Sequence, residues 1–434
     1  MLALDELLDA PIAPTTKGAA TGAIGHSIRS LRRLGLSVLD GDLPWPAALI
    51  RRDALEHNAR WMREFVGRAG VSLCPHGKTS MSPQLFDRQL RDGCWGITVA
   101  TASQLRTCRH YGVQRLLLAN QLIGRSDIEL VLGELRADPD FELFVLVDSA
   151  AGLALLIEAL QAAPIGRPLQ VLLEVGIPGG RTGVRSLEEG QALGRILRQA
   201  APLIALRGVE AFEGIVGGDD HGRIELTVHQ LLDDVVELAA RGVAEDWFAP
   251  GDIILSAGGS ACFDLAATRL REAAPGRPTH VVLRSGCYLT HDVLFYARLQ
   301  SRMRERSASV WGPGPGLQNA LEVWAPVQSV PESGRAICAL GKRDISFDMG
   351  LPLPLWWYRA GRHDRPVQAP AGLRVMALND QHAWLELDGG AMPLSVGDLM
   401  GFGVGHPCTT FDRWSLLHVV DEDYRVVDAI RTFF

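Results

Sequence analysis

The hydrophobic pattern is regular through the larger part of the chain. In the helical segment that begins at Arg52, four apolar residues recur at helix spacing: Leu55, Ala59, Met62 and Val66. After this segment, short apolar runs that end in small or polar residues alternate with segments of helical period. The apolar runs cover residues 71–74, 96–100, 115–119, 143–147, 169–175, 206–212, 253–256 and 280–283. The helical segments between them include residues 83–91, 103–111, 126–135, 150–160, 187–200, 223–240 and 262–272.

This alternation predicts a fold of the α/β class. Strands that are buried on both faces and alternate with helices pair in parallel. About eight such units close into a (β/α)8 barrel of the TIM type, and we expect this barrel over residues 46–300. An open doubly wound sheet is the alternative, because it would also alternate, although it usually has fewer strands.

The pattern changes after about residue 292. The sequence WGPGPG at residues 311–316 is a Gly/Pro break, and alternating strands without long helices follow it. These runs cover residues 321–330, 335–340, 373–378, 383–387, 416–420 and 424–430. They predict a C-terminal antiparallel β domain over residues 301–434. We expect the N-terminal residues 1–45 to pack with this domain.

Composition excludes several classes of partner. The chain has 43 basic and 50 acidic residues, a net charge of −7. A mildly acidic chain argues against nucleic-acid binding and against a polybasic membrane surface, and no apolar run is long enough to span a membrane.

The N-terminus lacks the basic region of a secretory signal. The seven cysteines are scattered without a CxxC motif, so we expect a reduced, cytoplasmic protein.

The chain has only three lysines: Lys17, Lys78 and Lys342. Function in a β/α barrel collects at the C-terminal ends of the strands, and Lys78 directly follows the first predicted strand. A lysine at a barrel mouth can form a Schiff base with an aldehyde cofactor. The alternative interpretation of Lys78 is an ordinary surface lysine. Lys17 and Lys342 lie in segments that look like solvated turns. Lys78 is therefore the candidate amine.

A glycine-rich turn follows the seventh predicted strand, with the sequence SAGGS at residues 256–260, and Gly286 follows the eighth. Barrels often hold phosphate at this place, because backbone N–H groups and a helix N-terminus face the anion. Such a turn is weak evidence alone. Together with Lys78 it suggests a phosphate-bearing aldehyde cofactor, pyridoxal 5'-phosphate.

His406 and Cys408 form a second candidate site. An imidazole and a thiolate two residues apart can both reach one Zn²⁺ ion. The alternative is a turn histidine and a buried cysteine, and the spacing alone favours that alternative.

Seven motifs, taken together and in order, resemble the fold-type III pyridoxal-phosphate enzymes with an alanine-racemase-like barrel. They are PHGKTSMSPQL, GITVATASQL, LLEVGIPGGRTGV, SAGGS, LRSGCYLTHD, NDQHAWLEL and GHPCTTFDRWSLLHVV. Within that group the chain is most similar to the D-serine dehydratase / D-threonine aldolase family, which includes bacterial amino acid deaminases. The resemblance covers roughly residues 45–434.

The resemblance implies a role for each matching residue. Lys78 matches the catalytic Schiff-base lysine, His382 matches a family histidine near the site, and His406 with Cys408 matches a divalent metal pair, for which zinc is expected. The remaining matches are to cofactor-binding positions: His76, Arg181, Ser256, Gly258, Gly259, Ser260, Arg284, Gly286, Cys287 and Tyr288. In this family the second domain of one subunit helps to close the barrel mouth of another, so a homodimer is expected.

Three departures from the family pattern affect the interpretation. Gly77 stands where the family commonly has alanine, and the EEH segment reads Asp380-Gln381-His382 here. Residues 214–221 do not fit the usual motif cleanly, which leaves the role of His221 open.

The metal pair suggests the reaction. In the family, His with Cys goes with dehydratases, whereas His with Asp goes with aldolases. Cys408 therefore favours the dehydration and deamination of a D-3-hydroxy amino acid, such as D-serine, to a 2-oxo acid and ammonia. The alternatives are a D-threonine-type aldolase, an amino acid racemase, a non-catalytic pyridoxal-phosphate-binding protein and a metal-only barrel hydrolase.

Overall fold

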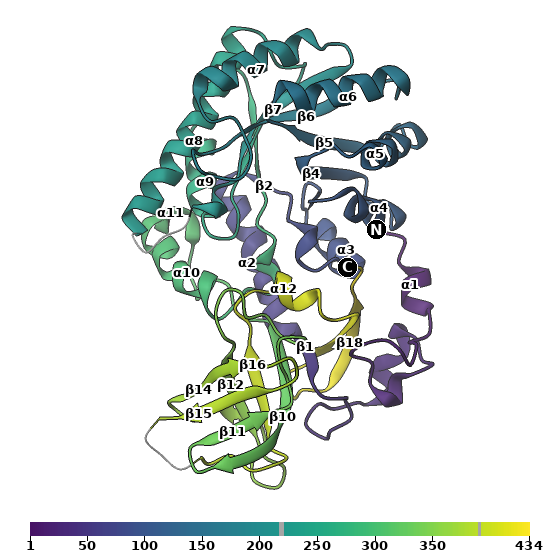
Figure 1. Ribbon diagram of the computed structural model, residues 1–434, viewed down its shortest axis with the longest axis vertical. Coiled ribbons are helices and arrows are strands. Elements are labelled where there is room, and N and C mark those ends of the chain that lie inside the picture. The colour runs from purple at the N-terminus through teal and green to yellow at the C-terminus, as the bar shows by residue number, and fades with distance from the viewer. Residues whose placement is uncertain (217–220, 389–391) are drawn as a thin grey trace.

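The computed structural model describes residues 1–216, 221–388 and 392–434, and its described strands form two sheets (Figure 1). The first sheet has eight strands, and every neighbouring pair is parallel. A parallel bridge between His76 and Thr98 joins its first strand to its second, which curls the sheet into a barrel. The barrel prediction is confirmed. The strands are β2 (Ser72–Leu73), β3 (Ile97–Val99), β4 (Arg115–Gln121), β5 (Glu142–Val147), β6 (Leu169–Val175), β7 (Ile204–Ala211), β8 (Ile253–Ala257) and β9 (Thr279–Leu283).

Helices surround the barrel strands because one face of each strand points outward into an apolar layer. On β4, Leu116 and Leu118 belong to the core shared with the helices, whereas Leu117 points into the barrel beside Phe144 and Leu172. Serine and threonine residues cap three of the helices at their N-termini. The helices are α2 (Arg52–Ala69), α3 (Pro83–Arg91), α4 (Ala102–His110), α5 (Arg125–Ala137), α6 (Ala150–Ala162), α7 (Leu187–Gln199), α8 (His221–Ala244) and α9 (Phe263–Arg271).

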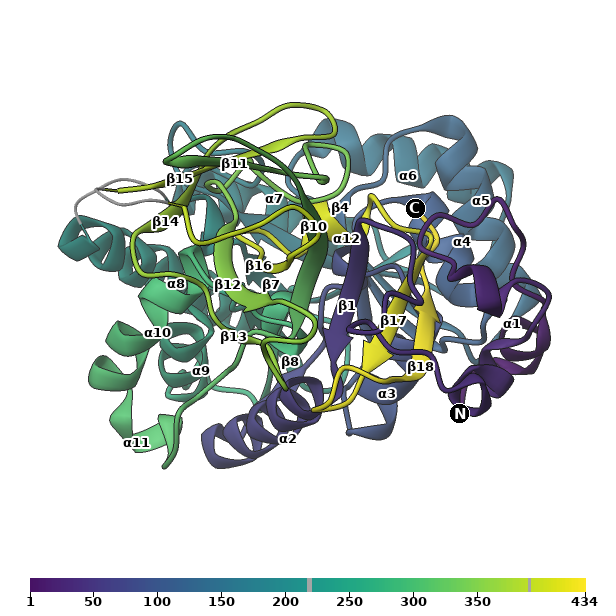
Figure 2. The ribbon, with the colours of Figure 1, turned by 90° about the horizontal axis from the view of Figure 1, so that it is seen from below.

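The second sheet is almost entirely antiparallel and lies below the barrel in Figure 1. Its exception is the strand β1 (Ala47–Arg51), which pairs in parallel with β17 and antiparallel with β10. Figure 2 shows β1 between these two strands. The other strands are β10 (Leu321–Glu332), β11 (Arg335–Cys338), β12 (Leu353–Tyr358), β13 (Val367–Gln368), β14 (Leu373–Leu378), β15 (Ala383–Leu387), β16 (Leu399–Gly403), β17 (Leu416–Val420) and β18 (Val426–Arg431).

The structure adds strands that the pattern did not reveal. Residues 47–51 were counted with the barrel segment, yet β1 belongs to the second sheet. The strands β12, β13 and β16 were not predicted, since Pro354 interrupts β12 and two glycines interrupt β16. Each of these strands is held by its register with neighbours, which a single sequence does not display.

The N-terminal segment packs on the edge of the second sheet. It contains α1 (Asp5–Asp9) and the 3-10 turns η1 (Thr21–Ala23) and η2 (Ile28–Leu34). Leu7, Ile12 and Leu31 share an apolar cluster with Leu416 and Tyr424.

Short helical elements connect the two sheets near the barrel mouth. The helices α10 (Phe295–Arg306) and α11 (Ala308–Trp311) follow the barrel, and the short helix α12 (Cys408–Phe411) packs on the turn η3 (Gly77–Thr79). Within the described residues, none of the helices combines the length and the apolar character needed to cross a membrane.

Candidate active site

Lys78 lies in η3, the turn that directly follows strand β2. The turn is tight: a Cβ atom at Gly77 would lie 2.7 Å from Ile97 Cγ2 and 3.0 Å from Phe86 Cε1. Glycine at this position is therefore a packing requirement of this chain, which accounts for the departure from the family's alanine. Lys78 is half-buried, and no hydrogen bond or ion pair within the described residues engages its Nζ atom.

His76 precedes Lys78 and faces the barrel interior. Its Nδ1 atom is buried and has no hydrogen-bond partner in the described part of the chain. Burial, with smaller contributions from Lys78 and Arg284, lowers the pKa of His76 well below its ordinary value. The imidazole is therefore neutral near pH 7, and Nδ1 is a polar atom that lacks a partner.

The glycine turn after β8 is held by a carboxylate. The N–H groups of Gly258 and Gly259 donate to the two oxygens of Glu213, at 3.1 and 2.5 Å. Gly258 has φ +87°, and a Cβ atom there would lie 2.7 Å from Leu283 Cδ2. Glu213 is buried, and burial raises the pKa of its carboxyl. Sequence analysis assigned no role to Glu213, because only the fold brings it to this turn.

Hydroxyl and backbone donors lie beside this turn. Ser260 Oγ is 3.1 Å from Ser285 Oγ and accepts the N–H of Cys287 at 3.3 Å. A Cβ atom at Gly286 would lie 2.7 Å from Thr79 Oγ1 and from the backbone oxygen of His76, so the segment after β9 approaches η3 closely. Ser256 differs, because its hydroxyl donates to Val282 O at 2.9 Å inside the sheet.

These donors fit a phosphate-bearing aldehyde. A phosphate needs hydroxyl and N–H donors, and an aldehyde needs a primary amine; Ser260, Ser285 and Lys78 supply both near one mouth. The N–H groups of Gly258 and Gly259 are engaged by Glu213, so in this geometry these glycines shape the turn. Their direct contact with a phosphate stays a prediction.

Two arginines flank the barrel interior. Arg284 Nη2 lies 2.6 Å from Glu210 Oε2 and donates to Ala211 O at 2.6 Å. Both members of the ion pair are buried. The guanidinium of Arg181 lies over Phe212, 5.0 Å from the ring centroid. Arg181 therefore contributes positive charge at the mouth, whereas Arg284 is committed to an internal pair.

Tyr288 lies in the turn Cys287–Leu289 that follows β9. Its side chain is buried in the apolar layer between barrel and helices and interacts with Gln89 and Cys94. Its contact with a cofactor stays a prediction.

The predicted metal pair lies at the same mouth. Cys408 Sγ is 3.6 Å from Cys287 Sγ and 3.4 Å from Thr79 Oγ1. A hydrogen bond from Cys287 lowers the pKa of Cys408 well below its ordinary value against the opposing effect of burial, and His406 lowers it further. This environment favours the thiolate of Cys408, the form that binds metals.

His406 is oriented by Asp348, which sequence analysis did not select. Its Nδ1 atom lies 2.5 Å from Asp348 Oδ2, and Thr409 Oγ1 donates to Asp348 Oδ1 at 2.7 Å. Burial alone would lower the pKa of His406, but Cys408 and Asp348 outweigh it and raise the pKa to about 9. No spacing signal could have found Asp348, because 58 residues separate it from His406.

The donors around Cys408 fit a soft divalent metal, since thiolate and imidazole are ligands that zinc prefers. In the described ranges, no three histidine, cysteine or acidic side chains already converge on one metal position. Metal binding would therefore draw these donors together.

The two remaining histidine predictions fall elsewhere. His382 is exposed at the turn between β14 and β15, where the neighbouring Asp380 pairs with Arg343. Its place near the site stays a prediction. Residues 217–220 and the side chain of His221 lie outside what the structure describes.

The other two lysines have different environments. Lys17 Nζ donates to Arg343 O at 2.7 Å and pairs with the buried Asp344 at 3.0 Å. It therefore ties the N-terminal segment to the second domain, and it does so from an exposed turn, as expected. Lys342 is exposed, as expected.

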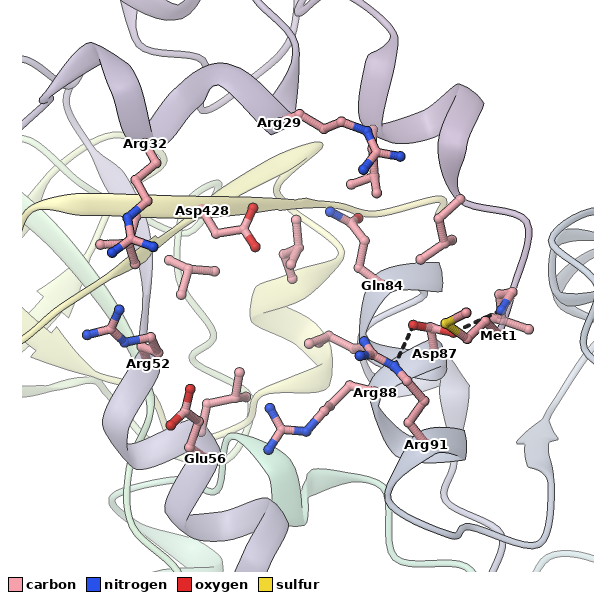
Figure 3. A pocket seen from close by; sticks show the side chains of 18 of the residues that line it. Met1, Arg29, Arg32, Arg52, Glu56, Gln84, Asp87, Arg88, Arg91 and Asp428 are labelled. Atoms are coloured by element: carbon pink, nitrogen blue, oxygen red, sulfur yellow. Dashed lines mark hydrogen bonds and ion pairs between the residues drawn. The ribbon is translucent and has the colours of Figure 1, made fainter.

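A separate pocket of about 680 Å³ lies between the N-terminal segment, α2, α3 and β18 (Figure 3). Arginines and acids alternate around it, and Arg91 pairs with Asp87 at 2.8 Å. None of the predicted site residues lines it.

Comparison with known proteins identifies the family of this chain. The family model for the alanine racemase N-terminal domain matches residues 50–285, more than half of the chain, and a model for the serine dehydratase domain matches residues 320–420. The chain belongs to the alanine racemase N-terminal domain family, and so to the fold-type III pyridoxal-phosphate enzymes. The predicted resemblance is confirmed.

Similar proteins of comparable length are lyases. D-threonine aldolase from Arthrobacter sp. is 26% identical over 378 residues, covering 86% of this chain and 88% of the relative. D-threo-3-hydroxyaspartate dehydratase from Delftia sp. is 28% identical over 196 residues, covering 42% of this chain and 50% of the relative.

Two solved structures share the fold. D-threonine aldolase from Filomicrobium marinum superposes with a TM-score of 0.71 at 22% identity, covering 92% of this chain and 97% of that one. A cysteine-to-alanine variant of D-threo-3-hydroxyaspartate dehydratase in the metal-free form gives 0.69 at 20% identity, covering 92% and 99%. At these identities the likeness shows the fold alone.

Proposed function

We propose that this protein is a pyridoxal-phosphate-dependent, metal-assisted lyase that converts a D-3-hydroxy amino acid to a 2-oxo acid and ammonia. One observation carries the proposal: Thr79, the neighbour of Lys78, lies 3.4 Å from the thiolate of Cys408. Lys78 and the proposed metal pair are therefore near one another at the barrel mouth. A reaction at both Cα and the β-hydroxyl of one substrate requires this proximity.

Lys78, Ser260 and Ser285 would hold the cofactor. When bound, pyridoxal phosphate supplies an electron sink for the charge that develops at Cα of an amino acid. Lys78 would supply the amine for its aldehyde and a base for the Cα proton. Arg181 adds positive charge at the mouth, where a substrate carboxylate would gain from it.

His406 and Cys408 would hold the metal. A bound divalent metal supplies a Lewis acid that lowers the cost of losing the β-hydroxyl. Burial lowers the pKa of His76, so its imidazole adds no positive charge beside Lys78 near pH 7. The net reaction with D-serine balances as pyruvate plus ammonia, because the water that leaves is taken up again on hydrolysis.

The D-threonine aldolase reaction is the second candidate, since a relative matched over most of both chains carries that name. The thiolate of Cys408 supports the dehydratase instead. So does the dehydratase relative whose cysteine-to-alanine variant is described in a metal-free form. Racemization would leave the metal pair without a role.

The proposal is tested with purified protein and D-serine. We expect pyruvate and ammonia in equal amounts, loss of both after treatment with a chelator, and recovery when Zn²⁺ is added back. L-serine is the control for configuration. Full activity in metal-stripped protein would refute the metal role. A homodimer and a cytoplasmic location stay predictions of the resemblance.

A further inference from the structure

The backbone and the side chain of Cys287 contact different parts of the site. Its backbone N–H donates to Ser260 Oγ at 3.3 Å, within the donors that fit a phosphate. Its side chain points the other way, to Cys408, with the two sulfur atoms 3.6 Å apart. Cys287 is only 4% exposed, so solvent hardly reaches its thiol.

The separation of the two sulfurs matches a shared metal ion. A disulfide needs about 2.05 Å between sulfur atoms. Two thiolates bound tetrahedrally to one zinc ion, each with a Zn–S bond of about 2.3 Å, lie about 3.8 Å apart. The observed 3.6 Å is close to the second value.

Ligand number favours the same reading. His406 and Cys408 alone make two protein ligands, whereas catalytic zinc sites keep three protein ligands and one open position. Adding Cys287 would give a Cys₂His set with one position left for the oxygen of a substrate. The three side chains do not yet converge on one position in the described residues, so metal binding would have to draw His406 toward the two sulfurs. Asp348 at Nδ1 of His406 leaves Nε2 as the ligating atom, the arrangement in which a carboxylate fixes a metal-bound histidine.

We propose that Cys287 is the third protein ligand of the metal, which joins the barrel to the second domain through a Cys₂His site. This inference rests on the proposed metal role of His406 and Cys408. Cys287 would then act at both sites, with its N–H group beside the cofactor and its sulfur bound to the metal.

The test compares the wild-type protein with Cys287→Ala and with Cys338→Ala, a buried cysteine of strand β11 away from the site. The alanine variant at 287 keeps the backbone N–H, so the cofactor's absorbance reports that the mouth is intact. Zinc affinity is measured by equilibrium dialysis against a chelator. X-ray absorption at the zinc edge counts the sulfur ligands in the wild-type protein and needs no variant.

We expect two sulfur ligands at about 2.3 Å in the wild-type protein and in Cys338→Ala, and one in Cys287→Ala. Zinc affinity of Cys287→Ala should fall by at least about 100-fold, because losing a partner behind a metal ligand already costs about 10–100-fold. One sulfur in the wild-type protein, or unchanged affinity in Cys287→Ala, would overturn the third ligand and leave the proposed reaction standing. A wild-type protein that binds no zinc would overturn both.

Discussion

Thr79 Oγ1 lies 3.4 Å from Cys408 Sγ, although 329 residues separate them along the chain. This contact joins the turn that carries Lys78 to the short helix α12 that begins at Cys408. The second domain therefore brings Cys408 to the turn that carries Lys78. A barrel without this domain would keep Lys78 and lose His406 and Cys408.

Lys78 should be the only lysine that the cofactor requires. Lys78→Ala should abolish the imine absorbance of the cofactor and the activity, because Lys17 is committed to Asp344 and Lys342 is exposed. Lys342→Ala is the matched control and should keep both. Absorbance that persists in Lys78→Ala would show that the cofactor assignment is wrong.

Cys408→Ala should separate the two halves of the site. It should lose metal and dehydration, because it removes the thiolate, and keep the cofactor's absorbance, because Lys78 is untouched. Metal content and absorbance are measured on the same sample. Metal bound at the wild-type level in Cys408→Ala would contradict the assignment of the pair.

Asp348 should act through His406. Asp348→Ala should weaken metal binding by about 10–100-fold, the usual effect of losing a carboxylate behind a metal-bound histidine. Asp348→Asn should recover part of the affinity, since its amide oxygen can still accept from Nδ1. Asp380→Ala, at an exposed acid of the same domain, is the control. Equal affinities in all three variants would exclude a positioning role for Asp348.

Gly77→Ala should loosen the turn that carries Lys78. The added Cβ would lie 2.7 Å from Ile97 Cγ2, and overpacking of this kind costs about 1–3 kcal/mol. Thermal unfolding should show a lower midpoint and weaker cofactor binding. Gly67→Ala in helix α2 has open space around its Cβ and should be neutral or stabilising. A Gly77→Ala protein as stable as the wild type would refute the packing requirement.

His418 should make the fold sensitive to acid. Burial lowers the pKa of His418 to about 4, although its Nε2 atom lies 2.9 Å from Gly18 O. The unfolded chain binds this proton below pH about 6.5, so stability is present above that pH and falls as pH drops toward 4, by about 3 kcal/mol in total. His418→Gln should reduce this fall in the free energy of unfolding. His26→Gln, at an exposed histidine, should not change it, and identical pH profiles for both variants would contradict the assignment.

The sequence predicted much of this architecture because its signals are local. Eight apolar runs separated by helical segments are sufficient to predict a barrel, and the place of Lys78 directly after the first strand is confirmed. The strand β1 was misplaced, since its membership in the second sheet depends on pairing with β10 and β17.

Long-range contacts account for what the sequence did not reveal at the site. Asp348 and Glu213 became visible only when folding brought them to His406 and to the glycine turn. The motif around Cys287 predicted only a cofactor-binding position. The direction of its side chain toward Cys408 is a property of three dimensions that no motif carries.

The most direct test of the central claim is a product analysis with D-threonine as the single substrate. Dehydration gives 2-oxobutanoate and ammonia, whereas aldol cleavage of the same molecule gives glycine and acetaldehyde. We expect 2-oxobutanoate and ammonia in equal amounts, dependent on Lys78 and on metal. Glycine and acetaldehyde as the main products would contradict the dehydratase assignment and identify the protein as an aldolase.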